Sequence, residues 1–169
     1  LGLVSSLVCG TVATADLQEL DYRIVANNAV AGDNNWTVEI YAVLDNGSRL
    51  DAVAGDGKLD KRLAISGGSF YQNTFGGNTS TAINPALYPS FPSLQYDSFV
   101  TIGLETNVGN AMLDIGIDWT TFEAGGAIWT DNGSWFATPD DAQVNEVNGQ
   151  VLIGQFTVGV GDTVSGIVN

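Results

Sequence analysis

The chain has 169 residues, of which 44% are hydrophobic, so it is long and apolar enough for one folded domain, and a multidomain enzyme or a disordered chain is excluded. Five Lys and Arg against nineteen Asp and Glu leave a formal net charge of −14, which excludes nucleic acid and anionic membrane surfaces as partners. Only 14% of the residues are charged while 21 are glycine, a composition that disfavours helices and predicts an all-β protein.

Residues 1–15 form an apolar segment that turns polar at Asp16. The segment resembles the end of a secretory signal peptide with an A-x-A cleavage site, which implies export. We nevertheless expect it to stay attached as an arm, and it is too short and too rich in Ser and Thr to span a bilayer. Its alternation favours a strand over a helix. That strand either completes its own sandwich or adds to the sheet of a neighbouring copy. The side chains expected to fill apolar slots are Leu1, Leu3, Leu7 and Val8.

Alternating apolar and polar residues predict strands over 20–26 and 36–44, and the second ends at Asp45-Asn46-Gly47, a hairpin turn signal. After a polar stretch over 51–61, further strands are predicted at 63–65, 70–72, 98–106, 112–119, 133–139, 150–160 and 163–169. One helical turn is predicted near residues 139–143. Strands at roughly 8–12-residue spacing predict a single β-sandwich or jelly-roll-like domain over residues 16–169.

Residues 73–97 contain three of the four prolines and have no helical or strand period. We expect one long Pro/aromatic loop. Loops of more than about 15 residues are usually functional or packed by their own side chains. This loop either covers an open sheet edge or contacts a ligand or subunit.

Four segments of the sequence resemble those of a known group of proteins: FYQNTFGGNT, NPALYPSFPSLQYDSFVTIG, IGIDWTTFEAGG and DNGSWFATPDDAQ. The resemblance is to uncharacterised secreted proteins of environmental bacteria and covers roughly residues 20–160. It implies export and a β-sandwich, and no activity. In arrangement alone, an apolar arm followed by a sandwich also resembles pilin-like filament subunits that exchange a strand.

Aspartates in two regions are candidate calcium ligands, because hard cations bind carboxylate oxygens. Asp51, Asp56 and Asp60 lie in a loop-like stretch whose spacing does not fit an EF-hand. Asp114 and Asp118 are expected on one face of a strand, on either side of Gly116. For both groups the alternative is a solvent-exposed carboxylate.

Catalysis is not expected. The chain has no histidine, the usual base of serine and cysteine hydrolases, and its single cysteine, Cys9, allows no internal disulfide. Phosphate-binding and nucleophile-elbow motifs are also absent from the sequence. Glu39, Glu105 and Glu123 lie in or beside apolar strands and could pair as in a glycosidase. The alternative is that each points outward from an amphipathic strand.

Asparagines in four N-glycosylation sequons are candidate attachment sites: Asn35, Asn46, Asn78 and Asn132. The four tryptophans are candidates for a sugar-stacking platform or, as the alternative, for core packing: Trp36, Trp119, Trp129 and Trp135.

Two hypotheses follow. In the first, the chain is a structural subunit of an extracellular or cell-surface filament, and copies join head to tail by inserting the arm into a neighbouring sandwich. In the second, it is a secreted glycan- or calcium-dependent binding module. Neither hypothesis needs a cofactor other than calcium, and neither includes nucleic acid or a membrane span.

Overall fold

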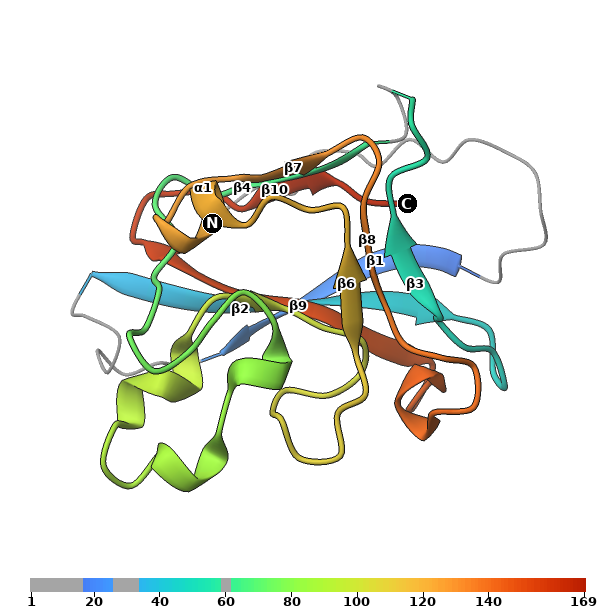
Figure 1. Cartoon of the computed structure of the whole chain (residues 1–169), viewed down its shortest axis with the longest axis horizontal. Helices are drawn as coiled ribbons and strands as arrows, with labels where there is room; N and C mark the ends of the chain where they lie inside the picture. The colour runs from blue at the N-terminus through green and yellow to red at the C-terminus, as the bar shows by residue number, and fades with distance from the viewer. Residues whose placement is uncertain (1–16, 26–33, 59–61) are drawn as a thin grey trace.

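A computed structural model of the chain describes residues 17–25, 34–58 and 62–169. Within these ranges the protein is a sandwich-like all-β domain with three antiparallel sheets and a single short α-helix, α1 (Thr120–Glu123) (Figure 1). The predicted fold class is therefore confirmed.

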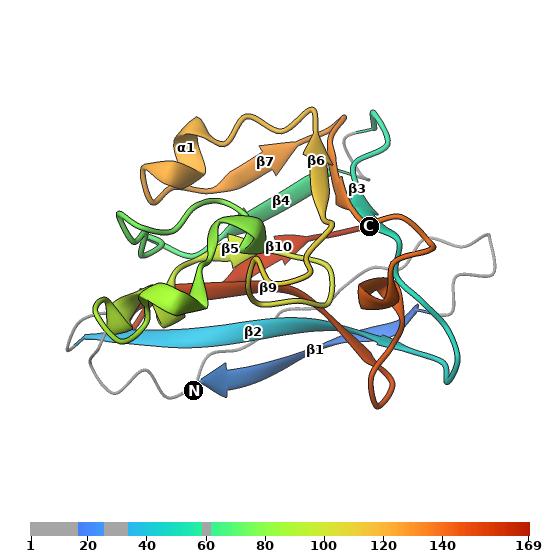
Figure 2. The same ribbon diagram turned by 60° about the horizontal axis from the view of Figure 1, so that its bottom comes forward.

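The largest sheet has four strands in the order β1-β2-β9-β5. Their bounds are Leu17–Val25 for β1, Asn35–Leu44 for β2, Gln150–Gly159 for β9 and Phe99–Val100 for β5. The register of β2 against β9 shifts between Ile40 and Tyr41, a β-bulge. Figure 2 shows β1 along the side of β2 that faces away from β9.

Two three-stranded sheets complete the domain, in the orders β10-β4-β7 and β3-β8-β6. The first contains β10 (Ser165–Ile167), β4 (Leu63–Ser66) and β7 (Ile128–Thr130). The second contains β3 (Ala52–Ala54), β8 (Ser134–Phe136) and β6 (Leu113–Ile115). In Figure 1, β10, β4 and β7 lie above the large sheet, and β3, β8 and β6 stand at one end. β3 and β7 were not predicted.

Several predicted strands are shorter in the structure. The strands predicted over 98–106 and 112–119 are β5 and β6, with two and three residues. Gly103 and Gly116, with φ of 75° and 71°, turn the backbone out of the extended region. A Cβ on Gly103 would lie 2.1 Å from the carbonyl oxygen of Gln143, so the chain also passes too close here for a side chain. The stretch over 70–72 is not a strand. The predicted helical turn is a 3₁₀ turn, η5 (Ala142–Val144).

The main core lies between the large sheet and the two smaller sheets. Its fully buried large side chains include Leu63, Phe122, Ile128, Trp135 and Phe156. The Trp135 indole N–H donates to the carbonyl oxygen of Thr101 at 3.1 Å, so its one polar group is satisfied inside the core.

The Pro/aromatic loop, residues 73–97, covers the other face of the large sheet near β5 and β9 (Figure 1). It contains three 3₁₀ turns, η2 (Ser80–Ala82), η3 (Pro85–Leu87) and η4 (Pro92–Tyr96). A second small core of Ile83, Leu94 and Phe99 lies beneath it. The side-chain amide of Gln155 on β9 donates to the carbonyl oxygens of Gln95 and Asp97, which fixes the loop to the sheet.

Candidate functional site

Strand β1 carries an apolar stripe on its core-facing side, formed by Leu20, Tyr22 and Ile24. Ile24 lies opposite Val38 of β2, whose side chain is 2% exposed in the core. Ile24 itself is 55% exposed and Tyr22 is 47% exposed. The register therefore directs the stripe toward the core side of the sheet. Leu20 packs against the main core, whereas Tyr22 and Ile24 are not covered by the second layer.

The stripe lies on an edge strand. β1 is nine residues long and, within the described part of the chain, pairs with β2 only. An edge of this length presents unpaired backbone groups to which another strand can be added. Edge position and exposed apolar side chains together make β1 a candidate docking surface.

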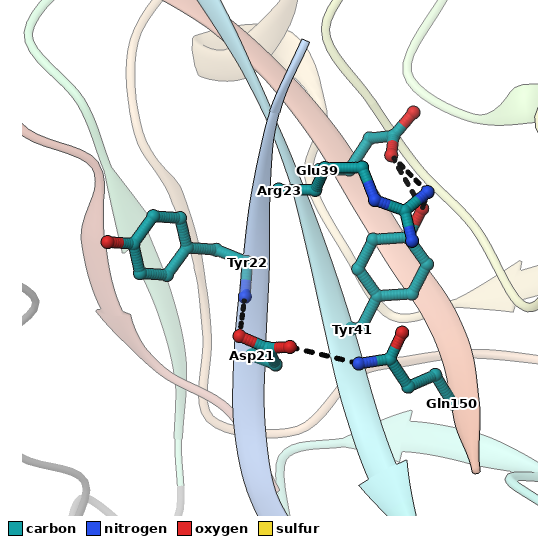
Figure 3. A network of polar contacts seen from close by, with 6 residues as sticks. All are labelled: Asp21, Tyr22, Arg23, Glu39, Tyr41 and Gln150. Atoms are coloured by element: carbon teal, nitrogen blue, oxygen red, sulfur yellow. Dashed lines mark hydrogen bonds and ion pairs between the residues drawn. The ribbon is translucent and has the colours of Figure 1, made fainter. Parts of the chain in front are cut away.

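The opposite side of β1 is polar and is linked to β2 by a network around Arg23 (Figure 3). Arg23 Nη1 donates to the Tyr41 hydroxyl at 3.2 Å and lies 3.7 Å from Glu39 Oε2. The Tyr41 hydroxyl donates to the same Glu39 oxygen at 2.5 Å. The guanidinium carbon of Arg23 also lies 5.0 Å from the centre of the Tyr41 ring, within cation–π range. These contacts hold all three side chains in one arrangement.

The network keeps Tyr41 protonated. Burial raises the pKa of Tyr41 well above its usual value, and the hydrogen bond to the Glu39 carboxylate raises it further, while Arg23 opposes the shift. The pKa of Glu105 nearby is also raised, mainly by partial burial of its carboxyl and then by the charge of Glu39. Glu39 and Glu105 were two of the predicted carboxylates, and the structure places them close enough to interact electrostatically.

A cavity of about 510 Å³, the polar pocket, opens beside this network. Its polar side chains include Arg23, Tyr41, Glu105, Asn145, Asn148 and Gln150. Asn148 and Gly149 have φ of 55° and 79° and form a two-residue turn, which is closed by the hydrogen bonds between Val147 and Gln150. Gln150 in turn donates to Asp21 Oδ2 at 2.9 Å, which connects β9 to β1 across β2 (Figure 3).

A buried carboxylate, Asp97, holds the Pro/aromatic loop. Asp97 is 0% exposed and accepts hydrogen bonds from the backbone N–H groups of Asn73 at 2.6 Å and Gly77 at 3.0 Å. Burial raises its pKa to about 7, and these hydrogen bonds oppose the shift. Asp97 is thus a buried group that titrates near neutral pH in the covered region of the sheet.

Five of the predicted site residues lie outside the residues that the structure describes: Leu1, Leu3, Leu7, Val8 and Asp60. Of the other two aspartates in the first calcium candidate, Asp51 pairs with Arg49 at 2.9 Å and Asp56 with Lys58 at 3.8 Å. Both carboxylates have a cationic partner.

Asp114 and Asp118 do not share a strand face, so that expectation is wrong. β6 ends at Ile115, and Gly116 turns the chain before Asp118. Asp114 Oδ1 accepts from the Trp119 indole at 2.9 Å, and Asp118 Oδ1 accepts from the backbone N–H of Thr120 at 3.0 Å. Across residues 17–25, 34–58 and 62–169, no group of three acidic or Cys side chains is placed to hold a metal ion.

The sequon asparagines have different surroundings. Asn46 and Asn132 are exposed, whereas Asn35 and Asn78 are half-buried. The Asn78 side-chain nitrogen, to which a glycan would attach, donates to Glu123 at 2.7 Å. Among the four, Asn46 and Asn132 offer the most accessible nitrogen.

The tryptophans do not share one environment. Trp135 is 0% exposed in the core, and Trp129 is 53% exposed on β7. The Trp36 indole N–H donates to the carbonyl oxygen of Gly159, and the ring centres of Trp119 and Phe122 lie 6.0 Å apart. Core packing, the alternative considered for these residues, is the outcome for Trp135, and Trp36 and Trp119 are partly buried against the same core.

The polar pocket was not predicted as a site, because Arg23, Tyr41 and Gln150 come from distant parts of the sequence. Its one local signal is the Asn148-Gly149 pair, a two-residue hairpin turn signal.

Comparison with protein-family models, curated proteins and solved structures found no match to the chain. Among the described residues, no helix has the length and apolar character that a membrane span requires.

Proposed function

We propose that the chain is a structural subunit of an extracellular filament, in which residues 1–15 of one copy dock beside β1 of the next. The observation that carries this proposal is the apolar stripe on edge strand β1, where Tyr22 and Ile24 remain 47% and 55% exposed on the core-facing side. An incoming apolar strand would cover that stripe and pair with the edge at the same time.

The chemistry of the arm suits this surface. Leu1, Leu3, Leu7 and Val8 supply large apolar side chains, and burying four such groups contributes roughly 6–10 kcal/mol before the cost of ordering the arm. Main-chain hydrogen bonds along β1 would define direction and register.

Docking on a second copy is favoured over folding back onto the same chain. A two-residue hairpin turn into β1 would lie just before Leu17. The residues there, Thr14, Ala15 and Asp16, lack the Asn-Gly or Asp-Gly pair that such turns prefer. The arm and the β1 stripe are different surfaces, so their contact is head to tail and propagates into a filament unless it closes into a ring.

We place the filament outside the cell or on its surface. This location is supported by the export-like pattern of residues 1–15. The formal charge of −14 on each subunit would keep neighbouring filaments apart until salt screens it. The role is structural and requires no catalytic group.

The test compares the full chain with two altered forms by sedimentation and negative-stain microscopy. The full chain is expected to form filaments, and both deletion of residues 1–15 and Ile24→Asp are expected to leave monomers. Ile115→Asp is the matched control, because Ile115 is an isoleucine on β6 that is 65% exposed and lies away from β1. Filaments that persist in Ile24→Asp, or a full chain that stays monomeric, would contradict the proposal.

A further inference from the structure

We propose that the polar pocket binds a neutral sugar unit of a glycan, held by Glu105 and Asn148. The pocket lies on the polar side of β1, opposite the apolar stripe, and it differs from the tryptophan and aspartate loops considered from the sequence. Its volume of about 510 Å³ is within the roughly 300–1,000 Å³ of typical small-ligand sites. The inference does not depend on filament formation.

The charges around the pocket disfavour an anionic ligand. Glu105 and Asp141 line it, and Glu39 lies beside it in the network of Figure 3. Among the described residues that line the pocket, Arg23 is the only cation, and it is already held by Tyr41 and Glu39. A phosphate or carboxylate would meet repulsion from the carboxylates and from the overall charge of −14.

Two polar side chains of the pocket are available to a ligand. Neither Glu105 nor Asn148 makes a side-chain hydrogen bond or ion pair in the part of the chain that the structure describes. A carboxylate accepts two hydroxyl hydrogens, and an amide both donates and accepts. Neighbouring hydroxyls of a sugar ring provide the matching pattern.

The rest of the lining suits a ring with polar edges and C–H faces. Leu104 and Val147 contribute apolar surface, and Val147 is 71% exposed. Tyr41 is fixed by its bonds to Arg23 and Glu39, so the polar wall is already arranged before a ligand arrives.

The experiment uses the full chain on an array of neutral mono- to trisaccharides of glucose, galactose, mannose and N-acetylglucosamine. Titration calorimetry then measures the dissociation constant of the best sugar. Glu105→Ala and Asn148→Gly are each expected to weaken binding about tenfold or more, because each removes hydrogen bonds to the ligand. Asn148→Gly retains the backbone, because glycine readily adopts the φ of 55° found there.

Asp131→Asn is the control, because Asp131 is an exposed carboxylate outside the pocket lining, and its binding is expected to equal that of the unaltered chain. Thermal melting checks that each variant is folded, and Asn148→Gly provides the test if Glu105→Ala does not fold. The inference is overturned if no neutral sugar binds at millimolar concentration, if both pocket variants bind normally, or if spermidine binds and the sugars do not.

Discussion

The two edges of the four-stranded sheet differ in how they are covered. At one edge, β5 has only two residues, and the Pro/aromatic loop packs over it with Leu94 0% exposed. At the other edge, β1 has nine residues, and Ile24 is 55% exposed. Sheet edges attract further strands unless they are short or covered. The β5 edge is closed within the domain, whereas the β1 edge is open among the described residues and is the edge to which our proposal adds another chain.

The largest effect is expected at the covered edge. Leu94→Ala removes a fully buried side chain from the small core of the loop, so the free energy of unfolding should fall by about 2–5 kcal/mol. Urea unfolding followed by fluorescence measures this change. A loss below about 1 kcal/mol would show that the loop adds little to stability, and it would contradict the difference drawn here between the β5 edge and the β1 edge.

A pH-dependent effect is expected from Asp97 in the same region. Its pKa is about 7 in the folded chain and near 3.8 when unfolded, so between these values the folded state holds a proton that the unfolded state has released. Stability should therefore fall as pH rises from about 4 to 7, with a slope from this group of up to about 1.4 kcal/mol per pH unit.

Asp97→Asn removes this titration. Melting curves of both proteins between pH 4 and 8 should show a flatter pH dependence for the variant, and the difference between them isolates Asp97 from the other acidic groups. Asp131→Asn, at an exposed site, should parallel the unaltered chain. Equal slopes for the Asp97 variant and the unaltered chain would contradict the expected titration.

The smallest effect on the unfolding free energy of the isolated domain is expected at the β1 edge. Ile24→Ala should change the unfolding free energy by no more than about 0.5–1 kcal/mol in a chain lacking residues 1–15, because Ile24 is already 55% exposed. The same denaturant titration measures it. A loss as large as that of Leu94→Ala would mean that the stripe belongs to the core of its own domain.

Sequence periodicity was sufficient for the long strands and insufficient for the short ones. The alternation over residues 36–44 made β2 clear, and β9 was recognisable as a long, mostly apolar stretch, which the structure buries along most of its length. β3 and β7 have three residues each, too few to establish a period. The extents of β5 and β6 depend on positive φ angles at Gly103 and Gly116, which alternation does not reveal.

The two surfaces of β1 could be predicted only in part. The alternation of Leu20, Tyr22 and Ile24 was evident, but their exposure depends on how far the second layer extends. The polar pocket depends on pairing between β1, β2 and β9, and β1 and β9 are more than 120 residues apart in sequence. Glu39, Glu105 and Glu123 were considered as possible pairs because they lie in or beside apolar strands, and only the folded chain shows that Glu39 and Glu105 are the two that interact.

The most direct test of the docking surface is a disulfide trap that uses the native Cys9 of the arm. One copy retains Cys9, and the second carries Cys9→Ala together with Ile24→Cys, so a disulfide between the two unlike copies requires that the arm of one reach β1 of the other. The account predicts such a crosslinked pair after mild oxidation of the mixture, and none when Ile115→Cys replaces Ile24→Cys. If a single chain with Cys9 and Ile24→Cys instead closes on itself as a monomer, and the mixture gives no crosslinked pair, the arm docks within its own chain and the filament account is contradicted.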